Sequence, residues 1–369
     1  MTSVLDWLAL SLVPGLGPAG CRRLLDHFDS PEAILFAPVQ ELYRVPGIQA
    51  RQVAPLADRD GLRRRAEEEL RALRGVGGSV LTLADDAYPL PLRQLSDPPP
   101  VLYVLGNREL PAATGVAVVG SRAATTYGRR VAFSLARELA TQGVTVTSGL
   151  ALGIDSEAHA GAVAGGGTTV AVLGCGLDVV YPLANRQLYR KIAEAGALLS
   201  EYPLGTKPEG FRFPARNRII AGLSSGVVVV EATRKSGSLI TAQIALDYGR
   251  EVFAVPGQVD SCKSEGTHWL LQQGARLVQG VDDILPEIGR IPSGGLGGAA
   301  GQGRAVPSTG LDPAAVTLLE LLETYPQGRD ELIEKTAFSP ARVSELLLFL
   351  EIEGLVEILP GNLVRKTRG

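Results

Sequence analysis

Short, Val-rich apolar runs alternate with helical patterns between residues 110 and 285. The runs are almost continuously apolar, which is typical of strands that are buried on both faces of a parallel sheet. Helical patterns, such as those at 127–143 and 239–250, separate them. Repeated β-α units predict an α/β fold with a doubly wound, mainly parallel sheet. The expected strands are 115–122, 144–150, 168–176, 197–203, 226–233, 251–257 and 275–280.

Residues 1–75 are expected to form a small helical domain. A Gly-rich turn opens the segment 13–28, and a weaker copy begins 32 positions later, at 45–57. In helix-hairpin-helix motifs such a turn points backbone N–H groups at a DNA phosphate. Glycines that only permit tight turns in a helical bundle would give the same pattern. Gln49 stands where the second copy would have its second glycine, so both interpretations stay open.

The C-terminal part divides into a linker and a small domain. Residues 290–311 are dominated by Gly, Ala, Pro and Ser, which is typical of a flexible linker. Residues 312–369 read as three helices and a hairpin, a winged-helix-like pattern, and the sheet domain is then 76–289. The candidate recognition helix, 339–355, has one Arg and three Glu. This balance favours contact with a protein, or weak contact with DNA.

Composition limits the function further. The chain has 369 residues with Lys+Arg 36 and Asp+Glu 39, a net charge of −3, which excludes a uniformly basic coat but not a local basic site. The N-terminus has no basic region before an apolar stretch, and no apolar run reaches about 18 residues. The three cysteines are far apart and form no CxxC. We therefore expect a cytoplasmic protein with no membrane contact, no metal site and no cofactor.

The first candidate site is the turn "VVGSRAATTYG", at 118–128. Ligands of doubly wound folds bind beyond the carboxyl ends of strands. Gly120 would let a ligand approach the backbone, Ser121 can donate to a phosphate, and the Arg122 guanidinium can bind one. The turn lacks the GxGxxG spacing and no acid follows the second strand, so NAD is disfavoured. Alternatively, Arg122 pairs with an acid at the edge of the sheet.

Two further motifs follow strands. Asp155 and His159 share a helix face at i and i+4, and a structural pair is favoured over an acid–base pair. The second motif lies at a helix start, where free N–H groups bind anions or are capped by a serine. Its residues are Lys235, Ser236, Gly237 and Ser238, and the lysine favours an anion.

The stretch "FRFPARNR" gathers three arginines and two phenylalanines just before a helix. Guanidinium groups bind phosphates and aromatic faces stack on bases, which is how proteins hold single strands without reading sequence. Alternatively, the phenylalanines belong to the core and the arginines pair with acids such as Glu201 or Glu231. The candidate contacts are Phe211, Arg212, Phe213, Arg216, Asn217 and Arg218.

The chain resembles the DNA-processing protein A family, also called DprA or Smf. The resemblance rests on six ordered blocks: "VGSRAATTYG", "SGLALGIDSEAHAGA", "VLGCGLDVVYP", "EYPLGTKPEGFRFPARNRIIAGLS", "VVEATRKSGSLITAQIALDYGREVFAVPG" and "EGTHWLLQQGA". It implies a Rossmann-like core that binds single-stranded DNA and loads RecA recombinase during natural transformation, or also serves repair, without enzymatic turnover. By the family pattern, Arg122, Phe213, Arg216, Asn217 and Arg218 belong to the DNA-binding pocket. It also implies a homodimer through this core, for which we expect contacts around Thr267–Leu271.

Two other functions compete with this one. Nucleotide phosphoribohydrolases share a similar core and use a PGGxGTxxE motif, whose Glu acts on the ribose. Here Thr241 stands where that Glu should be, and a hydroxyl cannot replace a carboxylate that stabilises an oxocarbenium-like state. A pure interaction protein is the third reading. Phosphate contacts would give a salt-dependent affinity, with a slope of roughly −0.7 per contact on single strands, whereas this reading predicts a flat slope.

Overall fold

The computed structural model describes residues 3–109, 115–289, 312–322, 327–336, 338–352, 355–359 and 363–366. The chain forms two compact units, Met1–Ser293 and Gly294–Gly369. The expected linker, 290–311, lies outside the described residues. No helix in the described part of the chain is long and apolar enough to cross a bilayer.

The first unit begins with a group of helices, as the sequence predicts. They are α1 (Val4–Ser11), α2 (Gly17–Leu25), α3 (Pro31–Phe36), α4 (Val39–Leu42), α5 (Ala50–Val53), the 3₁₀ turn η1 (Ala54–Ala57) and α6 (Arg59–Gly75). Gly15 and Gly17 have positive φ, at 75° and 61°, so the turn before α2 requires glycine. In the second copy Gln49 starts α5, and its backbone N–H donates to Gln52 Oε1 at 2.8 Å. Gln49 is therefore part of a helix cap.

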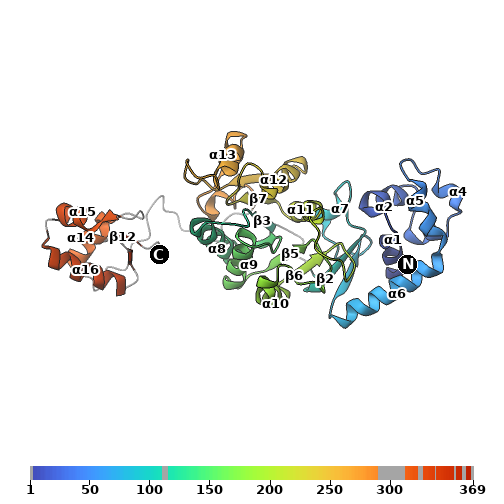
Figure 1. Cartoon of the computed structure of the whole chain (residues 1–369), viewed down its shortest axis with the longest axis horizontal. Helices are drawn as coiled ribbons and strands as arrows, with labels where there is room; N and C mark the ends of the chain where they lie inside the picture. Colours follow the sequence, from blue (N-terminus) through green and yellow to red (C-terminus); the bar gives the residue numbers. More distant parts are fainter. Residues whose placement is uncertain are drawn as a thin grey trace. The chain divides into compact units, whose positions relative to one another are not determined.

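A nine-stranded sheet forms the body of the first unit, in the order β1-β2-β6-β5-β4-β3-β7-β8-β9 (Figure 1). All seven expected strands are present: β3 (Gly115–Val119), β4 (Thr145–Ser148), β5 (Thr169–Leu173), β6 (Ala197–Ser200), β7 (Gly226–Val229), β8 (Glu251–Ala254) and β9 (Arg276–Leu277). They pair in parallel, as predicted. The chain proceeds outward from β3 in both directions, which makes the fold doubly wound.

The sequence analysis did not anticipate β1 (Ser79–Thr82) and β2 (Val101–Gly106). They extend the sheet beyond β6 as an antiparallel pair, and the short helix α7 (Leu90–Arg93) lies between them in the chain. Parallel sheets with an antiparallel edge are common in large α/β folds, and a mainly parallel sheet therefore remains the right description.

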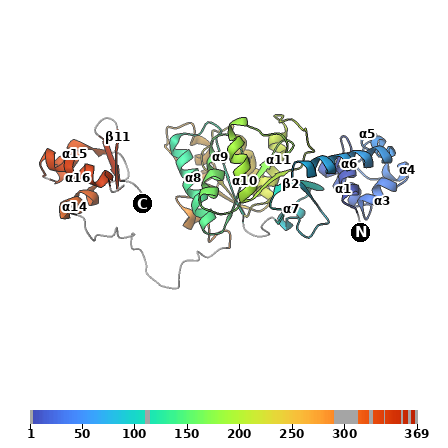
Figure 2. The same cartoon turned by 90° about the horizontal axis from the view of Figure 1, so that it is seen from below.

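Helices cover both faces of the sheet (Figures 1 and 2). Val116 and Val118 of β3 pack in one core with α8 (Thr126–Thr141) and α9 (Ile154–Ala164). Ala117 and Val119 point to the opposite core, with α11 (Arg212–Gly222) and α12 (Gly237–Asp247). This alternation along one strand is why the runs are apolar at every position. The remaining elements are η2 (Leu183–Asn185), α10 (Arg186–Ala195), α13 (Glu265–Gln272) and η3 (Val281–Asp283).

The N-terminal helices share a core with the sheet. Leu8, Leu24 and Leu62 belong to the same buried cluster as Tyr103 of β2 and Leu198 of β6. Because one core joins them, the expected boundary near residue 75 does not separate two compact units. The helical region is therefore held firmly against the β1–β2 side of the sheet.

The second unit has the predicted winged-helix pattern. It contains α14 (Pro313–Leu321), β10 (Gln327–Gly328), α15 (Arg329–Thr336), α16 (Pro340–Ile352), β11 (Val356–Leu359) and β12 (Leu363–Lys366). The last two strands form the expected hairpin, and β10 adds a third strand that the sequence analysis missed. The segment that connects the two strands, 360–362, lies outside the described residues.

Candidate functional site

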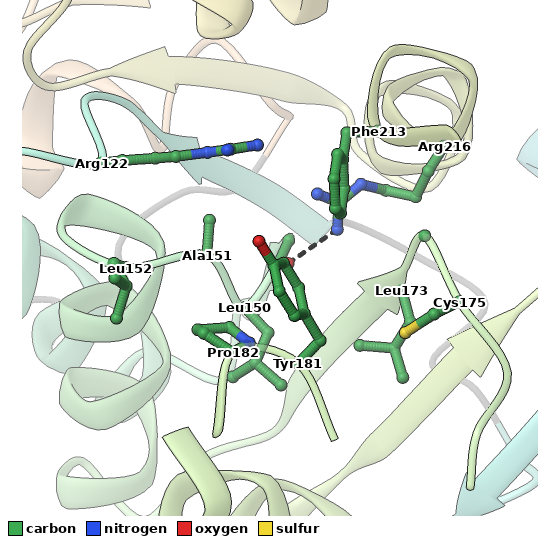
Figure 3. Close-up of a pocket in the computed structure, with 12 residues that line it drawn as sticks. Arg122, Leu150, Ala151, Leu152, Leu173, Cys175, Tyr181, Pro182, Phe213 and Arg216 are labelled. Atoms are coloured by element: carbon green, nitrogen blue, oxygen red, sulfur yellow. Dashed lines mark hydrogen bonds between the residues drawn. The ribbon is translucent and has the colours of Figure 1, made fainter. Parts of the chain in front are cut away.

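A pocket lies where β4 and β5 end, beside the first turn of α11 (Figure 3). Its volume is about 90 Å³, well above the roughly 10–15 Å³ that a single water molecule needs. Most of its wall is apolar, and two guanidinium groups supply its positive charge. The lining residues are Arg122, Gly149, Leu150, Ala151, Leu152, Leu173, Gly174, Cys175, Tyr181, Pro182, Phe213 and Arg216.

A cation and two aromatic rings line the mouth of the pocket (Figure 3). The Arg122 guanidinium lies 5.1 Å from the centre of the Phe213 ring. The Tyr181 ring stacks on Phe213, with centroids 5.7 Å apart and an interplanar angle of 25°. Arg122 is exposed, and no carboxylate of the described residues lies within ion-pair distance of it, so the alternative of a paired Arg122 is not what the structure has. This group can bind a phosphate and a flat ring together.

A second cation–aromatic group lies beside the first, formed by the first residue of α11 and by rings on the loop that leads into it. The Arg212 guanidinium is 4.8 Å from the centre of the Tyr202 ring and 4.9 Å from that of Phe211. Phe211 is 68% exposed, so it does not belong to the core. Arg212 also pairs with Glu209 at 3.2 Å, an exposed contact that a stronger anion could replace.

The sequence analysis missed Tyr181 and Tyr202. Tyr181 follows the predicted strand 168–176 by a few residues, and Tyr202 lies at the end of the predicted strand 197–203; in the structure both lie on loops after β5 and β6, at the carboxyl edge of the sheet. That position was the available signal, because parallel strands deliver all such loops to one edge.

Arg216 forms the buried floor of the pocket. It is 4% exposed, and its Nη1 donates to the Gly149 carbonyl at 2.7 Å and to the Val172 carbonyl. Its Nε is buried with no hydrogen-bond partner among the described residues. Burial lowers the pKa of Arg216, and the nearby Asp155 carboxylate opposes that shift. A direct phosphate contact, as expected from the sequence, would require a ligand to reach this depth.

Asp155 and His159 support the fold, as the favoured interpretation predicted. The Asp155 carboxylate accepts from the Gly149 and Ala151 N–H groups, at 3.2 and 3.4 Å, and burial raises its pKa. His159 is fully buried, and its Nδ1 lies 2.7 Å from the Thr169 hydroxyl. Burial lowers the His159 pKa to about 3, so the ring is neutral. Neither side chain is placed for acid–base chemistry in the pocket.

Arg218 and Asn217 lie farther along α11, away from the pocket. Arg218 pairs with Glu201 and with Asp97, the latter at 3.3 Å, and its side chain is 11% exposed. The alternative that an arginine of this stretch pairs with Glu201 is therefore correct for Arg218. The second partner, Asp97, is too distant in sequence to be predicted. Asn217 Nδ2 donates to the Gly237 carbonyl at 3.4 Å and so ties α11 to α12.

Replacing Arg218 with alanine should lower the free energy of unfolding by about 3 kcal/mol, because Glu201 would lose its counter-charge. Burial already raises the Glu201 pKa, and the Arg218 charge opposes that rise. Urea unfolding would measure the loss. An unchanged midpoint would contradict this structural role.

The space around the turn at Gly120 and Ser121 is occupied by neighbouring residues of the protein. A Cβ on Gly120 would lie 2.7 Å from Ile154 Cγ1 and 2.9 Å from the Glu231 carbonyl. Ser121 is buried, and its N–H donates to that carbonyl at 2.8 Å. The Glu231 side chain accepts from the N–H and hydroxyl of Thr125, at the start of α8. A carboxylate thus occupies the helix N-terminus where a dinucleotide phosphate would bind, which agrees with the expectation that NAD is disfavoured.

At the start of α12 a serine caps the helix, which is the capping alternative of the sequence analysis. The Ser236 hydroxyl accepts from the Ser238 N–H at 3.4 Å and bonds the Ser238 hydroxyl at 2.7 Å, whereas Lys235 is exposed. Thr241, where a phosphoribohydrolase would have its glutamate, is buried in α12. The structure therefore offers no observation in favour of that hydrolase. No cluster of metal-ligating side chains exists within the described residues.

Three family profiles match the sequence. The profile of DNA recombination-mediator protein A matches residues 79–289, which contain the pocket. The chain belongs to the DNA recombination-mediator protein A (DprA/Smf) family. Profiles for a DprA winged helix domain and for a SAM-like helix-hairpin-helix tandem match residues 302–362 and 8–59.

Relatives and solved structures agree with this assignment. Protein Smf of Synechocystis is 38% identical over 96% of both chains. The DNA processing protein DprA of Streptococcus pneumoniae is 47% identical over 56% of this chain and 73% of its own. Its X-ray structure matches with a TM-score of 0.69 and 36% identity, over 78% of this chain and 99% of that one. A Helicobacter pylori DprA structure, described for its single-stranded DNA binding mode, has a TM-score of 0.51 and 35% identity, over 56% and 93%.

Proposed function

We propose that this protein is a single-stranded DNA-binding recombination mediator and that the pocket beside α11 is its DNA site. The observation that carries the proposal is the exposed, unpaired Arg122 stacked on Phe213, with Tyr181 beneath, at the edge of the sheet where ligands bind. Duplex DNA hides its base faces, so stacking on these rings favours single strands. The Helicobacter relative's recorded binding of single-stranded DNA supports the same ligand class.

The candidate residues divide into two roles. Arg122, Phe213, Phe211 and Arg212, together with Tyr181 and Tyr202, would contact the strand, because each has a face or a guanidinium at the surface. Lys235, which is exposed just before α12, would add a phosphate contact. The others would hold these groups in place through the contacts described above: Gly120, Ser121, Arg216, Asn217, Arg218, Ser236, Gly237 and Ser238.

Family membership supports three finer proposals. The protein loads RecA onto single strands during natural transformation, or also in repair, and does so without enzymatic turnover. It acts as a homodimer through the Rossmann-like domain, with contacts from the half-buried side chains around Thr267–Leu271. Thr267 and Leu270 are themselves buried within the chain, so His268, Trp269 and Leu271 would carry that interface. These tasks would be divided among four segments of the chain: 1–75, 76–289, 290–311 and 312–369.

Alanine substitutions of Arg122 and of Phe213 should change DNA binding in different ways. Arg122→Ala should weaken binding to single strands of any sequence and make the log–log salt slope shallower by roughly 0.7, the share of one phosphate contact. Phe213→Ala should weaken binding by ~1–3 kcal/mol with little change of slope, because a stacking ring carries no charge. Fluorescence anisotropy with labelled oligonucleotides at several salt concentrations measures both quantities.

Arg137, an exposed arginine in the last turns of α8, provides the matched control for loss of a positive charge. Arg137→Ala should leave affinity and slope nearly unchanged. Equal losses of slope in Arg122→Ala and Phe213→Ala would contradict the proposed division between phosphate and base contacts.

A further inference from the structure

The loop between β6 and α11 is held by two carboxylates. Glu69 Oε1 accepts a hydrogen bond from the Leu204 N–H at 2.7 Å. The Asp178 carboxylate accepts from the next amide, that of Gly205, at 2.8 and 3.0 Å. Gly205 has a φ of 73°, so the loop turns sharply where the two carboxylates accept its hydrogen bonds. The same loop carries Tyr202 and ends at Phe211.

The two carboxylates come from different parts of the molecule. Glu69 lies on α6, in the N-terminal helical region, 135 residues before Leu204 in the chain. Asp178 lies just ahead of Tyr181, the ring that stacks on Phe213. The Gly176 N–H also donates to the Thr206 carbonyl at 3.0 Å. Both loops that supply aromatic rings to the site are therefore fastened together, and α6 is fastened to them.

The position of Glu69 is set by the packing of its helix. Its helix is anchored by Leu62, Ala66 and Leu73, which share a core with the pocket-lining Leu150. Burial raises the Glu69 pKa, and the nearby Asp178 charge raises it further. A half-buried carboxylate next to another one is costly unless it is hydrogen-bonded, so the Leu204 contact explains why an acid is found there. The preceding residue, Glu68, is exposed on the same helix.

We propose that Glu69 is a positioning residue through which the N-terminal helical region sets the geometry of the aromatic loop, and thereby the affinity for single-stranded DNA. This proposal rests on the proposed DNA-binding function. It assigns the helical region a part in binding that requires no DNA contact of its own. Without the Glu69 acceptor, the Leu204 amide opens and the loop samples conformations in which Tyr202 and Phe211 no longer face the strand.

The test uses the full chain and labelled oligo-dT. Glu69→Ala should bind about fivefold more weakly, the size of one lost hydrogen bond. Glu69→Gln keeps an acceptor oxygen and should bind almost as the unaltered protein does. Glu68→Ala is the matched control and should have no effect. Hydrogen exchange should show faster exchange at the Leu204 and Gly205 amides in Glu69→Ala, with the pocket strands unaffected.

Asp178→Ala provides a second arm, because Asp178 is exposed and its loss should not unfold the protein. It should weaken binding in the same direction, and the double variant should lose less than the sum, since both groups hold one loop. If Glu69→Ala and Asp178→Ala both bind as tightly as the unaltered protein, the positioning proposal is overturned and the DNA-binding function stands. If the unaltered protein does not bind oligo-dT, the proposed function itself fails.

Discussion

Arg216→Ala should lower the free energy of unfolding by about 3–5 kcal/mol, the usual cost of breaking a buried, charge-assisted network. The guanidinium joins the ends of two strands, since it donates to the carbonyls of Gly149 and Val172. Its removal leaves both carbonyls without this donor in a buried site and leaves Asp155 without its largest compensating charge.

Thermal unfolding checks this prediction, and a loss of this size corresponds to a melting temperature lower by roughly 10 °C. Arg122→Ala, which removes an exposed guanidinium from the same pocket, is the control and should have the same melting temperature as the unaltered protein. If Arg216→Ala were as stable as the unaltered protein and lost only DNA affinity, Arg216 would be a ligand contact, as the sequence alone suggested.

His159 should make the protein less stable as the pH falls below about 6.5. Its pKa is lowered to about 3 in the folded state, chiefly by burial, whereas in the unfolded chain it is ordinary. Between these values the unfolded state binds a proton that the folded state does not. Stability from this group is therefore full above pH 6.5 and falls by about 1.4 kcal/mol per pH unit towards pH 3.

Urea unfolding at pH 7.5 and pH 5.0 measures this effect, followed by fluorescence of Trp7 and Trp269, which lie in the same unit as His159. The unaltered protein should lose about 2 kcal/mol more than His159→Asn between the two pH values. The comparison is needed because Asp155 and Glu201, whose pKa values burial raises, act in the opposite direction in both proteins. Equal losses in the two proteins would show that His159 accepts a proton in the folded state.

The sheet was predictable because its strands are buried on both faces. Val116 to Val119 of β3 are apolar at every position, and each is buried against helices on one face or the other. The antiparallel β1 and β2 were missed since they are separated by a loop that contains several prolines, which interrupts the β-α repetition. Pairing between such strands is set by their fit to β6, which is not visible in local sequence.

The candidate site was predictable by place but less so by role. Residue type correctly brought Arg122 and Phe213 together at the strand ends, in contact across 5.1 Å. Residue type alone could not show that Arg122 is exposed whereas Arg216 is buried. Arg216 is buried because α11 places it over the carbonyl groups at the ends of β4 and β5, to which it donates. Asp97, the partner of Arg218, is likewise distant in sequence and close only in the fold.

The most direct test of the proposed DNA site is a binding titration of the purified protein with fluorescent oligo-dT, beside a duplex of the same length, at two salt concentrations. The structure predicts tighter binding to the single strand, with an affinity that falls as salt rises, since exposed guanidinium groups meet phosphates while the rings stack on bases. Equal affinity for the duplex, or no binding at either salt concentration, would contradict it. Release of free base from a nucleoside monophosphate would then be assayed, because the pocket would be left for a small nucleotide.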